Sequence, residues 1–203
     1  MTLGCIENII YNIAQLDYAS WSQYAEQQIH DRLTSNDERY QMSALRALKS
    51  IFQAFEFEIK EERQPLHHLV AKFFPILEGM LVSEAITTSA NYVSFMVLIA
   101  KIFYMSVQVS IASHRAELKI CSTYICIFDR LFFLLQIEIT PYLLQAQKIA
   151  PWVQLFCQIL ETELPAECTT QTETQAEIEA LNKQPNWVLK GIVAQITLKL
   201  FQK

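Results

Sequence analysis

The chain has 203 residues, of which 52% are hydrophobic and 11% aromatic, enough to bury a large core in one or two domains. Its formal charge of −5 gives no electrostatic reason to expect direct binding of nucleic acid. Only three glycines are present, fewer than the turns of a β-rich fold of this length normally need. The composition therefore predicts an all-α protein whose helices are joined by short polar loops.

The first 57 residues predict three helices. The first spans about residues 2–15, and a turn separates it from a second helix that ends near residue 33. Ser20 and Gln23 form a candidate capping box for the second helix. The third, residues 38–57, is amphipathic. Its apolar face consists of Leu45, Leu48, Phe52 and Phe55. Its polar face consists of Arg46, Lys49, Gln53 and Glu56.

A charged segment follows, and its carboxylates are predicted to form a solvated turn rather than an acid–base pair. The carboxylates are Glu56, Glu58, Glu61 and Glu62, with Lys60 and Arg63 between and beside them. Pro65 suits the first turn of a fourth helix, which extends to about residue 81 with Pro75 as a candidate bend.

The fifth helix, residues 92–112, is apolar and long enough to span a bilayer. Its polar residues Ser94, Lys101 and Gln108 are seven apart and so form one stripe. A charge near the middle of a span costs roughly 2.5–3.5 kcal/mol on insertion scales. The pattern favours a helix packed among other helices, without membrane insertion.

The sixth helix, residues 120–139, has a similar polar stripe, and Thr140 and Pro141 are N-cap and first-turn candidates for a seventh at about residues 144–162. An eighth helix spans residues 186–203. Its apolar stripe has no later helix to cover it, which predicts a poorly covered end of the helical stack. The stripe consists of Leu189, Ile192, Val193, Ile196 and Leu200.

Residues 163–184 are rich in Glu, Thr and Gln and lack a helical apolar stripe, so they are predicted to form a flexible acidic loop. Five glutamates and one lysine give this segment most of the net negative charge of the chain. Glu173, Glu177 and Glu179 are candidate residues for binding a basic protein partner. A solvated linker without a partner is the alternative.

The sequence contains no recognisable catalytic, cofactor-binding or metal-binding motif, so the chain is expected to be neither an enzyme nor a cofactor carrier. His67 and His68 are adjacent and cannot face the same way on a helix. His30 and His114 have no partner at ligand spacing. The five cysteines are scattered and odd in number, which suggests reduced thiols.

Paired helices of about 15–20 residues at a spacing of about 40 are typical of HEAT and armadillo repeats. The sequence thus predicts one HEAT-repeat-like α-solenoid segment over residues 1–203, with about four helix pairs. A closed helical bundle is the alternative architecture.

Several stretches resemble the importin-beta (karyopherin) superfamily, and within it the importin seven/eight branch. In "LGCIENIIYNIAQLDYASW" the matching residues are Asp17, Tyr18 and Trp21, with Ala19 in place of the family's proline. In the following repeat the resemblance rests on "FEF" at residues 55–57, "EER" at 61–63 and "FPIL" at 74–77. The acidic segment followed by a helix that begins near Trp187 also resembles the family.

The resemblance implies a segment from the N-terminal half of a nuclear transport receptor, active in cytoplasm, nucleus and nuclear pore. It implies binding of protein cargo, Ran GTPase and phenylalanine-glycine (FG) nucleoporins, without catalysis. The alternative function is a helical-repeat scaffold in another assembly.

Overall fold

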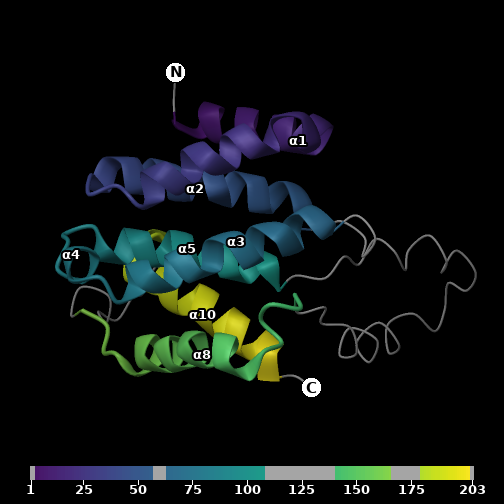
Figure 1. Cartoon of the computed structure of the whole chain (residues 1–203). Helices are drawn as coiled ribbons and strands as arrows, with labels where there is room; N and C mark the ends of the chain where they lie inside the picture. Colours follow the sequence, from purple (N-terminus) through teal and green to yellow (C-terminus); the bar gives the residue numbers. More distant parts are fainter. Residues whose placement is uncertain (1–2, 57–62, 108–139, 166–178, 202–203) are drawn as a thin grey trace, which may run out of the picture.

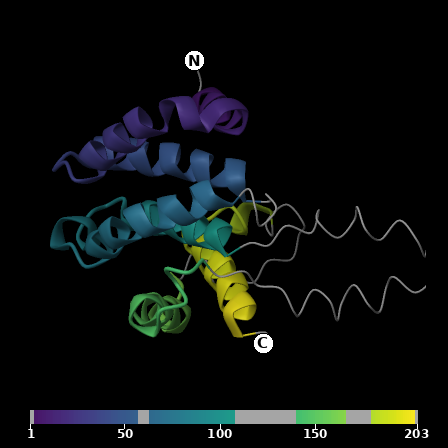
Figure 2. The same ribbon diagram turned by 45° about the vertical axis from the view of Figure 1, so that its right-hand side comes forward.

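In the computed structural model, residues 3–56, 63–107, 140–165 and 179–201 are described. They contain seven helices, a short helical stretch at residues 179–181 and no strand. The prediction of an all-α chain is confirmed for these residues. The helices form layers that follow one another from α1 through α2, then α3 with α5, to α10 and α8 (Figures 1 and 2). The two ends of the chain lie at opposite ends of this arrangement (Figure 1).

Helix α1 (Leu3–Leu33) is bent at Asp17, whose φ of −159° and ψ of 58° are not helical. The hydroxyl of Ser20 donates a hydrogen bond of 2.8 Å to the Asp17 carboxylate. The predicted division into two helices is therefore confirmed. The predicted capping box is wrong, because the break and its polar contact are centred on Asp17 rather than on Ser20 and Gln23.

Helix α2 (Glu38–Phe55) begins at the N-cap Asp37, whose side chain accepts a 2.8 Å hydrogen bond from the backbone N–H of Arg39. All four residues of its predicted apolar face are buried. Glu56, directly after the helix, is also buried at 7% exposure, so the prediction of a solvated carboxylate is wrong at this position. Glu58, Glu61 and Glu62 lie outside the described residues.

Helix α3 (Gln64–Leu81) continues through Pro75. A single helical turn, α4 (Glu84–Thr87), follows it and was not predicted. The Ser83 carbonyl accepts hydrogen bonds from the N–H groups of Ile86 and Thr87. This turn connects α3 to α5 (Tyr92–Ser106) and buries Ile86, which is 3% exposed.

On α5, the polar residues Ser94 and Lys101 are partly buried, and Gln108 lies outside the described residues. Burial lowers the pKa of Lys101; the nearby charge of Lys49 lowers it further, and Glu7 raises it in part. The polar stripe of α5 thus approaches the Lys49–Glu7 ion pair that joins α2 to α1 at 2.7 Å. No helix within the described ranges has the length and apolar character needed to cross a membrane.

Helix α8 (Ala146–Glu161) begins later than predicted, because residues 141–144 form a turn. The Thr140 carbonyl accepts hydrogen bonds from Leu143 and Leu144, so Thr140 is not the N-cap of this helix. The last helix, α10 (Pro185–Phe201), packs mainly against α5 and also against α8. Its predicted stripe is covered at Leu189, Val193 and Ile196, which are 6%, 0% and 0% exposed. The predicted bare C-terminal end is therefore wrong.

Aromatic side chains join α3, α5 and α8 in the core. The Trp152 ring lies with its centroid 5.2 Å from that of Phe74 and 5.0 Å from that of Phe103. Phe103 also meets Phe156 edge to face at 4.9 Å. The indole N–H of Trp152 donates a 2.8 Å hydrogen bond to Glu78, which satisfies its polar group within this apolar seam.

Candidate partner-binding groove

An open, largely apolar groove of about 240 Å³ runs between the C-terminal half of α1 and helix α2. Ile10, from the half of α1 before the kink, also contributes to its wall. The groove is lined by Ile10, Trp21, Tyr24, Ala25, Gln28, Ile29, Arg32, Ser43, Ala44, Ala47 and Ile51.

The spacing of the lining residues explains the groove. Trp21, Ala25, Gln28 and Arg32 are separated by four, three and four residues, so they share one face of α1. Alanines at positions 25, 44 and 47 leave space where the two helices meet. Larger residues at 10, 21 and 51 form the walls. Small side chains at a helix contact therefore create a depression of a size that an apolar side chain can enter.

Trp21 forms the aromatic part of the wall. Its ring meets Tyr18 edge to face at 5.5 Å, and its indole nitrogen is buried without a hydrogen-bond partner among the described residues. Tyr24 is 71% exposed at the rim. Arg32 carries the only charge among the lining residues. The groove is thus accessible, mostly apolar and positive at one end.

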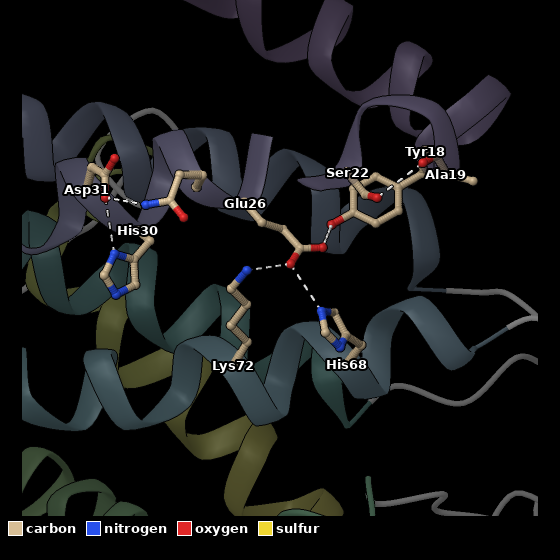
Figure 3. Close-up of polar contacts among 9 residues, drawn as sticks. Tyr18, Ala19, Ser22, Glu26, His30, Asp31, His68 and Lys72 are labelled. Carbon is tan, nitrogen blue, oxygen red and sulfur yellow. Dashed lines mark hydrogen bonds and ion pairs between the residues drawn. The ribbon is translucent and has the colours of Figure 1, made fainter. Parts of the chain in front are cut away.

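A buried carboxylate, that of Glu26, is the centre of a polar cluster between the second half of α1 and helix α3 (Figure 3). Glu26, with only 6% of its side chain exposed, accepts hydrogen bonds from three groups. These are the Tyr18 hydroxyl at 2.8 Å, the Lys72 ammonium at 2.7 Å and the His68 ring at 3.0 Å. Because Lys72 and His68 lie on α3, the cluster ties the second half of α1 to α3.

The electrostatics of this cluster follow from burial and hydrogen bonding. Burial alone would raise the pKa of Glu26, but the hydrogen bonds from Lys72, Tyr18 and His68, together with the charge of Lys72, lower it. Burial, and then the hydrogen bond and charge of Glu26, raise the pKa of Tyr18. Glu26 is therefore ionised and Tyr18 is neutral at physiological pH. We assign these residues a structural role, because they fix the helix that forms one wall of the groove.

The structure describes one of the three predicted partner-binding glutamates. Glu179 is exposed, in the short helical stretch 179–181, and forms no ion pair with another described residue. Glu173 and Glu177 lie outside the described residues, as does most of the predicted acidic loop. The stretch 179–181 was expected to be part of that loop.

Other candidate residues are placed as follows. His67 is partly buried and His68 exposed, as their adjacency on a helix requires. The ring atom Nδ1 of His30 lies 3.3 Å from the carboxylate oxygen Oδ1 of its neighbour Asp31. Within the described parts of the chain, no three His, Cys, Asp or Glu side chains are grouped so that they could hold a metal ion. Cys5 and Cys157 are exposed; the other three cysteines and His114 lie outside.

Sequence reasoning missed both the groove and the Glu26 cluster. A signal for the groove was present in the small residues Ala25, Ala44 and Ala47 beside an aromatic pair on an otherwise polar helix. A weaker signal for the cluster was the pair His68 and Lys72, one turn apart on a helix. Neither signal identifies its partner across the fold.

The chain was compared with protein-family models, with curated proteins and with solved structures, and no match was found. The groove and its supporting cluster are therefore interpreted from their own chemistry.

Proposed function

We propose that the chain is a non-enzymatic helical-repeat segment of an importin-like nuclear transport receptor. It binds protein partners through apolar sites between neighbouring helices. The observation that carries this proposal is the open apolar groove between α1 and α2, whose volume suits a phenylalanine side chain of an FG nucleoporin. The layered order of the helices and the sequence resemblance to the importin-beta superfamily support a solenoid arrangement.

The chemistry of the groove fits weak, repeated binding better than one tight contact. An apolar side chain gains from entering a groove lined by Ile10, Trp21 and Ile51. The groove is open, so the bound side chain keeps contact with solvent and buries only part of its surface. Many such contacts along a flexible FG chain raise the overall affinity through effective concentration. This is the binding behaviour that passage through a nuclear pore requires.

The proposal is tested by titrating the chain with an FG-repeat fragment and following the indole N–H resonances by NMR. We expect the Trp21 resonance to shift and the Trp152 resonance, whose N–H is bonded to Glu78 in the core, to stay unchanged. Ala47→Phe, which fills the groove, should weaken binding about fivefold or more. Val82→Phe, at a residue that is 83% exposed and outside the groove, is the matched control.

Two results would separate this proposal from its alternatives. FG binding that Ala47→Phe leaves unchanged would place the nucleoporin site elsewhere. A chain that binds neither FG repeats nor RanGTP would overturn the transport function and favour a helical scaffold in another assembly.

The acidic segment has its own test. Replacement of Glu173, Glu177 and Glu179 by glutamine should leave helix content nearly unchanged. Association with a basic surface on cargo or Ran should be slower than for the wild type at low salt, and the difference should shrink as salt rises. Equal association rates at low salt would mean that the segment is a solvated linker.

A further inference from the structure

The first half of α1 exposes a continuous apolar stripe. Ile6, Ile9, Ile13 and Leu16 are 44%, 46%, 45% and 86% exposed. Their separations of three, four and three residues place them on one face of the helix, in the spacing of the a and d positions of a coiled coil. Four large aliphatic side chains on one exposed face form the kind of patch that marks an interaction surface.

The opposite face of the same helix packs on the protein. Ala14 is 1% exposed, and Tyr11 and Ile10 are partly buried against the core. Glu7, on this inner face, forms the 2.7 Å ion pair with Lys49 of α2. The helix is therefore already seated on α2 through one side. The stripe is a second apolar side that no described residue covers.

The stripe is also free of charge. Glu7 is the only ionisable acid or base in residues 3–16 apart from the thiol of Cys5 and the phenol of Tyr11. Its carboxylate is paired with Lys49. The amide side chain of Asn12, which is exposed, lies along one edge of the stripe and carries no charge. The next charged residue along the chain is Asp17, which is exposed directly after Leu16, so the charge-free surface is that of residues 3–16. A second copy of the same surface would meet no like charge, although the whole chain has a net charge of −5.

We infer that the stripe formed by Ile6, Ile9, Ile13 and Leu16 is a self-association surface, on which the α1 helix of a second copy packs across a two-fold axis. The side chains of each stripe insert between those of the other, as they do where two helices with heptad spacing pack together. Each copy contributes four side chains of the stripe, far fewer than the roughly 20–30 residues that each partner contributes to a standard stable interface. The dimer is therefore weak, with a dissociation constant on the order of 100 µM.

Sedimentation equilibrium from about 10 to 500 µM tests this inference, since a constant on the order of 100 µM falls within that range. The mean mass should rise from 23.5 kDa toward twice that value. The double variant Ile9→Lys, Ile13→Lys should raise the dissociation constant at least about tenfold, because it places charges on both stripes. Both residues are exposed, so the thermal midpoint of the variant should stay close to that of the wild type.

The matched control is Val82→Lys, Leu198→Lys, which changes two residues that are 83% and 57% exposed outside the stripe. Its self-association should equal that of the wild type. A second variant, Asn12→Glu, should weaken the dimer at low salt, and added salt should restore it. A monomeric wild type at all concentrations would overturn the inference. So would equal loss of association in the stripe variant and the control.

Discussion

The carboxylate of Glu26 links three side chains from two helices, so its replacement is expected to be costly. Glu26→Gln keeps an acceptor for Tyr18, but it removes the charge that pairs with Lys72 and the carboxylate oxygen that contacts the His68 ring. Since His68 is exposed and Lys72 is partly exposed, solvent reduces the loss, and we expect a decrease of about 2 kcal/mol in the free energy of unfolding at pH 7. Chemical denaturation of both proteins measures it. Glu161→Gln, at an exposed residue, should change stability by less than about 0.5 kcal/mol.

The stability contributed by Glu26 should depend on pH in a defined direction. The pKa of Glu26 in the folded protein is below its ordinary value of 4.5. Its contribution is therefore fully present above that value and is lost as the pH falls through the lower folded-state pKa. The difference in stability between wild type and Glu26→Gln should shrink as the pH falls below 4.5. A difference that is constant from pH 7 to pH 3 would contradict the assigned role.

The attachment of helix α8 depends on Trp152. Its ring contacts Phe74 of α3 and Phe103 of α5, and it is 1% exposed. Trp152→Ala should destabilise the protein by about 3–5 kcal/mol, because it leaves a large cavity and deprives Glu78 of its hydrogen-bond donor. Hydrogen exchange should show faster opening of α8 than of α2. Uniformly faster exchange in every helix would instead mean that α8 does not open separately.

Helix α10 should contribute to stability as a buried element rather than as an exposed end. Val193→Ala should cost about 1–3 kcal/mol and Ile196→Ala about 2–4 kcal/mol, because both side chains are fully buried. Leu198→Ala, at a residue that is 57% exposed, is the control and should cost much less. Similar losses in all three variants would mean that α10 does not pack against α5 through this face.

At the scale of the whole molecule, local patterns in the sequence predicted where the helices lie better than they predicted which helices pack against one another. The amphipathic face of α2 and the break near Asp17 depend on residues a few positions apart, and both were predictable. The insertion of α10 beside α5, and the pairing of Glu26 with Lys72, depend on residues far apart in the sequence. Apolar periodicity shows which face of a helix is buried but not which helix covers it. The groove was missed for the same reason.

The pairing of α5 with α10 has a consequence for synthesis of the chain. Helices α1 and α2 are separated by four residues and can pack as soon as both have left the ribosome. The α5 surface that α10 covers stays uncovered until residues 185–201 have been synthesised. Closing the intervening loop of about 80 residues costs about 3 kcal/mol more than closing one of four. We expect nascent chains stalled before residue 185 to have a protease-resistant N-terminal part and to bind chaperones through α5. Synthesis of α10, which covers this surface, should end that binding.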